Sequence, residues 1–454
     1  MTHCAYWART SPFNWCLFVI SGLLCVGANA DPRTSVAGSI PSTRLRVVVE
    51  TDAPGGDPDD EGSLVRFFLY LNEWDVEGLI GTRGPKQSRL KLSGKERIGQ
   101  YIDDYADACA NLKVHDADYP PPERLRGITR QCYTGTEGRD LVLAIVRKDD
   151  PRPVWYLNWG TNERDDKPTA LREALDYVKA TGSAEDYARF TDKIHYVEVY
   201  KQNHLGSHRH ALAFYMDTFW PDMDGGRWYH RWRPLTERAG GFDVDRDLKR
   251  DHGPLSANYT IQKEGDTPAF MHLIPNGLGT PLRPDWGGWA GRYRFNEDLN
   301  MWWCDVRDAW QGKTHRDNTL IPWVAHIQND FRARADWCVA RTFGAANHEP
   351  VPVLQGDASR DVLLIDAAVG TRLTLSAAGS SDPDGDELSY LWRYYAEAGT
   401  YGGNVVIDRA TQRDCTVHVP RDARGRTIHV VLQVTDDGAP PLTRYRRAVL
   451  TGVR

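Results

Sequence analysis

A strand, an acidic loop, a helix and a second strand follow one another near the start of this chain, and this order constrains its fold most. Residues 46–50 form a largely apolar run that predicts a strand, 61–72 carry apolar side chains at helical spacing, and 76–81 predict another strand. Strand–helix–strand order favours parallel pairing, because the helix returns the chain across one face of the sheet. We therefore expect an α/β domain with an open, mainly parallel sheet and helices on both faces.

The same alternation continues along the chain to about residue 340. Strands are predicted at 154–158 and 194–200, and helices at 94–109, 141–148, 170–180 and 323–340. After a linker near residue 347 the composition changes to seven short β-rich runs separated by Asp, Gly and Pro turns. This pattern predicts a β-sandwich of the immunoglobulin or cadherin type over 346–454, with Trp392 in its core. The first domain is expected to span 44–345.

The amino terminus is typical of an exported protein. Arg9 precedes an apolar run at 15–26, and Ala28-Asn29-Ala30 ends it in a small-x-small cleavage pattern. Residues 1–30 are thus interpreted as a signal peptide, with an uncleaved anchor as the alternative, and 31–43 as a flexible leader. We expect a secreted or periplasmic protein without membrane association after cleavage.

Export permits disulfides, for which Cys109–Cys132 and Cys304–Cys338 are candidate pairs.

The loop at 50–60 is the first candidate for a chemical site. It holds five acidic residues in a turn rich in Gly and Pro. Open α/β sheets place their sites just after the carboxyl ends of strands, where this loop lies. Calcium prefers several oxygen ligands, so a hard divalent cation is one explanation for the crowded carboxylates. The alternative is a solvated turn that caps the helix at residue 61. The net charge of −6 gives no indication of a nucleic-acid partner.

The amino-acid sequence of this loop resembles that of a known family. Nucleoside hydrolases have an Asp-rich loop between their first strand and helix, and the segment 159–162, Trp-Gly-Thr-Asn, is similar to a later turn of that family. Gly-Gly-Asp-Pro-Asp-Asp at 55–60 is closer still to a secreted offshoot, the cellulose-binding proteins with a nucleoside-hydrolase-like domain and a C-terminal β domain. Further similarities to that offshoot lie at 264–268, 276–278, 287–289 and 329–331.

The resemblance implies a role for each matching residue. Asp52 would be a calcium ligand and the base that takes a proton from the attacking water, and Asp60 a second ligand. Asp59 would hold sugar hydroxyls. A backbone carbonyl near Leu157 or Asn158 would add a ligand, and Asp266 the last one, with Asp330 in reserve. Asn162 and Asn203 match substrate-contacting positions. The implied activity is calcium-dependent hydrolysis of N-glycosidic or related glycosidic bonds in a carbohydrate or nucleoside-like molecule.

The chain also departs from the family pattern. Three extra residues lengthen the loop, Glu50 replaces the family's first Asp, and Gly265 stands where some members have a His that helps to expel the base. The segment 81–84 lacks the substrate-binding Asn. These departures keep open a second hypothesis, a non-catalytic protein that binds cellulose or another wall polysaccharide. In both cases Trp286 and Trp289 would line a sugar-binding cleft; the alternative is that they pack an insertion over the sheet.

Overall fold

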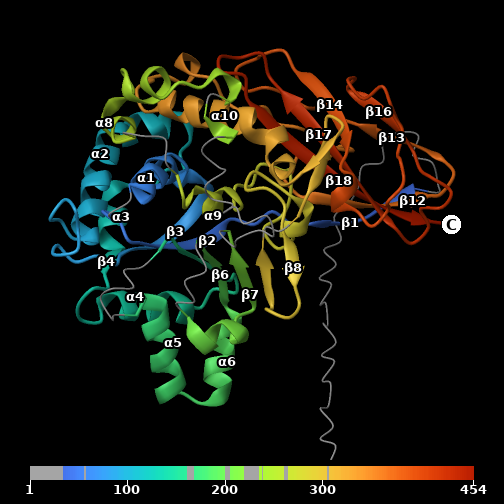
Figure 1. The fold of residues 1–454 in the computed structure, drawn as a ribbon. Coiled ribbons are helices and arrows are strands. Elements are labelled where there is room, and N and C mark those ends of the chain that lie inside the picture. The colour runs from blue at the N-terminus through green and yellow to red at the C-terminus, as the bar shows by residue number, and fades with distance from the viewer. Residues whose placement is uncertain are drawn as a thin grey trace, which may run out of the picture.

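An eight-stranded sheet forms the centre of the first domain (Figure 1). The computed structural model describes residues 34–55, 58–160, 168–199, 205–218, 235–237, 239–259, 264–303 and 306–454. The strand order is β4-β3-β2-β5-β6-β7-β9-β8, and only β8 runs antiparallel to its neighbour. The strands are β2 (Leu45–Thr51), β3 (Trp74–Gly81), β4 (Thr129–Gln131), β5 (Val154–Asn158), β6 (Ile194–Glu198), β7 (Phe214–Asp217), β8 (Arg294–Asn296) and β9 (Met301–Trp303). The predicted mainly parallel sheet is confirmed.

Helices cover both faces of this sheet. One face packs against α1 (Asp59–Leu69), α2 (Gly94–His115), α9 (Thr267–Met271) and α10 (Val324–Trp337). The other packs against α4 (Glu137–Arg147), α5 (Ala170–Thr181) and α6 (Ala184–Asp192), while α3 (Pro122–Gly127) and α8 (Gly253–Ala257) flank α2. Buried Val and Leu side chains from β2 and β5 alternate between the two cores. Each strand is therefore apolar on both sides, as a parallel sheet requires.

Local signals fix several helix starts. Ser93 and Glu96 form a reciprocal capping box at the start of α2, and the Thr169 hydroxyl accepts a hydrogen bond from the Arg172 N–H at the start of α5. Three acidic residues fill the first turn of α1, where the helix dipole favours negative charge. The acidic loop therefore leads directly into a helix whose amino end faces the carboxyl edge of the sheet.

Two packed sheets form the carboxyl-terminal domain. One has the order β1-β12-β18-β17-β14 and the other β13-β16-β15. Both contribute to one core that contains Trp392, as predicted. The strands are β1 (Thr34–Ile40), β12 (Val362–Ala368), β13 (Arg372–Ser376), β14 (Ser389–Tyr394), β15 (Ile407–Asp408), β16 (Asp414–His418), β17 (Thr427–Thr435) and β18 (Thr443–Val453). A short hairpin, β10 (Asp308–Trp310) with β11 (Lys313–His315), lies between the main sheet and α10 in the chain.

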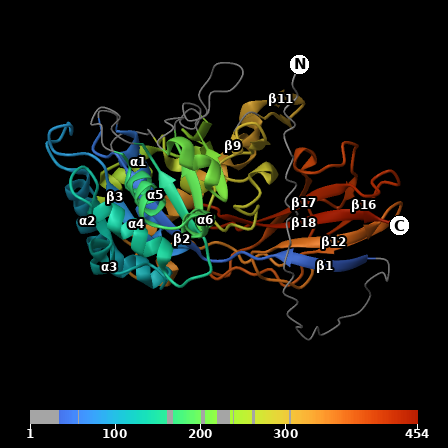
Figure 2. The same cartoon turned by 90° about the horizontal axis from the view of Figure 1, so that it is seen from below.

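The expectation of a flexible leader is wrong for residues 34–40. They form β1, which pairs antiparallel with β12 from Thr34 opposite Ala367 to Ile40 opposite Val362. Figure 2 shows β1 beside β12 at the edge of the second domain, with β2 continuing the chain into the first. The small and polar side chains of this segment gave no strand signal; pairing with a strand more than 300 residues away creates the strand. Residues 1–30 lie outside the described part of the chain.

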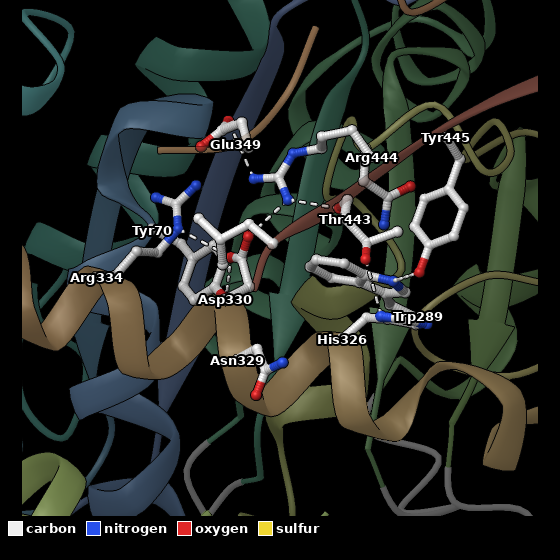
Figure 3. Close-up of polar contacts among 12 residues, drawn as sticks. Tyr70, Trp289, His326, Asn329, Asp330, Arg334, Glu349, Thr443, Arg444 and Tyr445 are labelled. Carbon is white, nitrogen blue, oxygen red and sulfur yellow. Dashed lines mark hydrogen bonds and ion pairs between the residues drawn. The ribbon is translucent and has the colours of Figure 1, made fainter. Parts of the chain in front are cut away.

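Buried polar contacts join the two domains (Figure 3). Asp330 of α10 lies 2.6 Å from Arg444 of β18 and 3.1 Å from Arg334, and it accepts a hydrogen bond from the Tyr70 hydroxyl at 2.6 Å. Arg444 also pairs with Glu349 at 3.0 Å. Burial alone would raise the pKa of Asp330, but Arg444 and Arg334 outweigh it and lower the pKa to about 2. The carboxylate is therefore ionised and fully compensated between the domains.

The Cys109–Cys132 disulfide expected for an exported chain does not form. The Cys109 thiol lies 3.6 Å from the Tyr105 hydroxyl, whereas the Cys132 thiol lies 3.3 Å from the Glu50 carboxylate on the other side of the sheet. The second expected pair includes Cys304, which is outside the described residues.

Within the described residues no helix has both the length and the apolar character needed to cross a membrane.

Candidate metal centre

Three carboxylates meet at the carboxyl edge of the sheet. Asp59 and Asp60 lie in the first turn of α1, and Asp266 stands immediately before α9. Oxygen atoms of these three residues all lie within 4.8 Å of one another. Two elements separated by about 200 residues in the chain therefore bring their acidic ends together, because α1 and α9 pack on the same face of the sheet. Asp60 and Asp266 were both predicted as ligands; Asp59 was predicted as a sugar contact.

Burial makes this arrangement unfavourable without a positive charge. Asp60 and Asp266 are each 2% exposed. Burial raises the pKa of Asp60 well above its usual value, and the neighbouring charges of Asp266, Asp52 and Asp59 raise it further. One hydrogen bond lowers the pKa of Asp60 in opposition to these effects, since the Thr51 hydroxyl donates to the Asp60 carboxylate. Like charges at this spacing cannot all ionise in a dry site unless a cation or a proton compensates them.

Neighbouring side chains hold the cluster in place. The Ser63 hydroxyl, one turn along α1, accepts hydrogen bonds from the Asp266 N–H and from the Thr267 hydroxyl, both at 3.2 Å. These contacts link the start of α9 to α1. The donor set, three closely spaced carboxylates, is the hard-oxygen type that calcium prefers. The residues present thus fit a divalent cation.

Asp52 lies beside this cluster but is bound by an arginine. The Arg83 guanidinium donates to an Asp52 carboxylate oxygen at 2.6 Å and to the Asp52 carbonyl at 2.7 Å. Both side chains are mostly buried. A Cβ at Gly160 would lie 3.6 Å from the Asp52 carboxylate carbon, in ordinary van der Waals contact with it. Arg83 follows β3 at the same edge as the cluster, and a charged residue just after a predicted strand was the signal that sequence reasoning left unused.

The other predicted residues fall into three groups. Leu157 lies inside β5, in register with Val49 of β2 and Val197 of β6. Its backbone is therefore part of the hydrogen-bonded ladder of the sheet. Asn162 and Asn203 lie outside the described residues. Asp330, the reserve ligand, belongs to the ion pairs between the domains and not to the cluster.

The two tryptophans expected in a sugar cleft are packed in the interior. Trp289 is 1% exposed, and its indole N–H donates to the Tyr445 hydroxyl of the second domain at 3.3 Å. Trp286 packs with Val362 and Val449 of the same domain. Neither ring presents a face to a sugar, because the 284–291 segment is covered by the β-rich domain. The alternative prediction, that both residues pack an insertion over the sheet, is right about packing, but the surface that they pack against belongs to the β-rich domain.

A row of four buried polar side chains, three of them acidic, lies along the same edge. Glu50, Asn158, Glu198 and Asp217 are in register across β2, β5, β6 and β7. Glu50 accepts hydrogen bonds from Tyr156 and from the Ala170 N–H, so it faces α5 and serves the fold. Burial, followed by the charge of Asp217, raises the pKa of Glu198 to about 8. Glu198 therefore holds a proton at neutral pH, and no local sequence pattern indicates this.

Comparisons with known proteins agree with this architecture. A family model described as cellulose-binding Sde182, nucleoside hydrolase-like domain, matches residues 46–293. A second model, described as cellulose-binding protein Sde0182, C-terminal domain, matches residues 372–452. A search of curated proteins finds no match.

A solved structure extends the similarity to nearly the whole chain. It is described as a nucleoside hydrolase-related hypothetical protein from Saccharophagus degradans that is associated with carbohydrate metabolism. The two chains are 30% identical and superpose with a TM-score of 0.73 over 90% of this chain and 100% of the other. The similarity of fold therefore extends over both domains of this chain.

Proposed function

Because the chain belongs to the family of cellulose-binding proteins with a nucleoside hydrolase-like domain, we propose that it is an exported, calcium-dependent hydrolase-like protein. Its substrates would be N-glycosidic or related glycosidic bonds in a carbohydrate-containing molecule. The single observation that carries this proposal is the meeting of Asp59, Asp60 and Asp266 at the carboxyl edge of the sheet. Open α/β folds bind their ligands at this edge.

Each acidic residue has a distinct part in the proposed site. Asp60 and Asp266 would hold the cation, since they are buried and adjacent, and half-buried Asp59 would reach either the cation or sugar hydroxyls. When bound, a divalent cation supplies positive charge that orients and acidifies water. Asp52 would accept the proton of the attacking water, and the remaining carboxylates would stabilise the positive charge that develops on the sugar ring.

Calcium binding to the full chain tests this proposal. We expect titration calorimetry to detect one site in the wild type and Asp60→Asn to weaken binding at least tenfold, because it removes a charge from the centre of the cluster. The matched control is Asp298→Asn, which alters an exposed carboxylate away from the cluster and leaves the affinity unchanged. Absence of a calcium signal in the wild type, or an equal affinity in Asp60→Asn, would contradict the metal site.

The ion pair between Arg83 and Asp52 favours a second candidate, a non-catalytic polysaccharide-binding protein. The Arg83 guanidinium occupies a carboxylate oxygen of Asp52 that a general base would need for the attacking water. The two candidates differ in a direct assay. Incubation of the full chain with nucleosides and glycosides should release reducing sugar if the site is catalytic. Retention on insoluble cellulose without any release of sugar would favour the binding role.

A further inference from the structure

One end of the β-rich domain brings two acidic turns and the linker between the domains together. Asp382 belongs to the turn between β13 and β14, and Asp436 to the turn between β17 and β18. The Asn347 side-chain N–H, from the linker, donates to an Asp436 carboxylate oxygen at 3.1 Å. A Cβ at Gly438 would clash with the Asn347 amide, so glycine at this position allows the linker to approach the turn.

Each aspartate uses one carboxylate oxygen to hold its own turn. The Asp382 Oδ1 accepts hydrogen bonds from the three successive N–H groups of residues 384–386, at 2.8, 3.1 and 3.3 Å. The Asp436 Oδ1 accepts from the N–H groups of Gly438 at 3.0 Å and Leu442 at 2.9 Å. The second oxygen of each carboxylate takes no part in these turns.

Three buried side-chain oxygens of this group accept no hydrogen bond from any of the described residues. They are the Oδ2 atoms of Asp382 and Asp436 and the Oδ1 atom of Asn347. Asp436 is 3% exposed and Asn347 is 7% exposed, so bulk water does not replace the missing donors. Buried polar groups are usually satisfied, and three acceptors without a donor in one place indicate a bound group that is positively charged.

The two turns are close enough for their charges to interact. The Glu387 N–H of the first turn donates to the Asp437 carboxylate of the second at 2.8 Å. Burial raises the pKa of Asp436 to about 6, and the charge of Asp382 contributes to the rise. A cation between the two carboxylates would offset both their burial and their repulsion.

The site lies directly beneath the surface of the domain. Pro383 and Gly385 of the first turn and Asp437 of the second are exposed. A small movement of the first turn would therefore admit an ion. Calcium lies about 2.3–2.6 Å from its oxygen ligands and is enclosed by them, so these ligands need no solvent-accessible surface of their own.

We propose that Asp382, Asp436 and Asn347 form a calcium site in which the ion ties the linker to the β-rich domain. Two carboxylate oxygens and an amide oxygen are hard ligands of the kind that calcium prefers, and water or backbone carbonyls would complete its coordination. The site is separate from the candidate metal centre, whose ligands lie at the starts of α1 and α9. It does not depend on the proposed function of the first domain.

The affinity of this site should be low. Calcium sites of extracellular modules bind at about 10⁻⁴–10⁻³ M, so this site would add no second step to the calorimetric titration of the candidate metal centre. Hydrogen exchange measured by mass spectrometry locates such binding. In the full-length protein we expect about 10 mM calcium to slow amide exchange at least fivefold in 380–388 and 434–442. Asp60→Asn should show the same protection there, because it alters only the first site.

Two substitutions test the ligands. Asp436→Asn and Asp382→Asn each remove a charge but keep an oxygen that can accept the N–H groups of the turn. Both should fold, with a Tm in the absence of calcium no lower than that of the wild type, and both should lose the calcium-dependent protection.

Asp366→Asn is the matched control. Asp366 is a half-buried carboxylate of β12 in register with Thr451, at the opposite end of the sandwich from the turn that joins Thr435 to Thr443. This variant should keep the protection. The proposal is overturned if calcium gives the wild type no protection at 380–388 and 434–442, if Asp436→Asn and Asp382→Asn retain it, or if Asp366→Asn loses it as well.

Discussion

At the scale of single residues, Arg83 determines how the acidic edge is charged. It makes two hydrogen bonds to Asp52, the carboxylate beside the cluster whose charge acts on Asp60. A fixed cation repels a second one and competes for the same carboxylate. Arg83 therefore competes with a bound cation for the Asp52 carboxylate.

We expect Arg83→Gln to bind calcium several-fold more tightly than the wild type, because the substitution removes that competing charge while glutamine can still donate to Asp52. Calorimetry at low and high salt measures the effect, which should shrink as salt screens the charge. The control is Arg89→Gln, whose arginine pairs with Glu61 on the side of α1 that faces α2. Weaker calcium binding in Arg83→Gln would mean that Arg83 instead orients Asp52 for the cation.

Glu198 gives a prediction about pH. Its folded pKa of about 8 lies above the ordinary value of 4.5, so the folded protein holds a proton that the unfolded chain releases. This group therefore contributes stability that is complete below pH 4.5 and is lost as pH rises to about 8. Glu198→Gln, which stays neutral, should remove this part of the decline in Tm between pH 5 and 8. The exposed Glu297→Gln should follow the wild-type pH profile, and identical profiles for all three proteins would contradict the assignment.

At the scale of elements, β1 connects the two ends of the chain. It covers the outer edge of β12, and its end is tied to Asp361 by the Ser39 hydroxyl and the Ser42 N–H. An uncovered strand edge offers unpaired backbone groups to other chains. The segment before the first domain is thus part of the second domain's sheet.

Removal of residues 34–40 should lower the Tm by about 5 °C or more and promote aggregation, because it deletes a strand and exposes the edge of β12. Calorimetry and light scattering measure the two effects. Val36→Ser is the control: Val36 is 56% exposed, so the substitution keeps the pairing and should change the Tm little. A truncated protein as stable and as monodisperse as the wild type would show that β1 adds no stability.

At the scale of the whole molecule, ion pairs in a dry interface hold the two domains together. Asp330 compensates Arg334 and Arg444, which come from different domains. Asp330→Asn leaves two buried arginines with less negative charge, so it should destabilise the protein by about 3–5 kcal/mol. The exposed pair of Asp245 and Lys249 is the control, since Asp245→Asn should cost less than 1 kcal/mol.

Scanning calorimetry and denaturant unfolding measure both variants. We expect one cooperative transition in the wild type, because the domains share a core that includes Trp289 and Tyr445. In Asp330→Asn this transition should move to lower temperature or separate into two. An unchanged midpoint would mean that the interface does not depend on this aspartate.

Local sequence patterns were enough to predict the order of elements and the acidic loop. Apolar periodicity and turn residues are local properties, so strands such as Val154–Asn158 and the loop after Thr51 could be predicted from neighbours in the chain. The meeting of Asp60 with Asp266 was predicted through the family resemblance, since no local signal joins residues 200 positions apart.

Contacts between distant segments determine which surfaces are covered and which charges are paired. The sequence cannot show that β1 pairs with β12, that Trp286 and Trp289 lie under the second domain, or that Arg83 binds Asp52. Each of these depends on contacts between segments far apart in the chain, whose free energy arises only when the fold brings them together. A tryptophan has the same local pattern in a sugar cleft and in an interface; burial by another domain makes the difference.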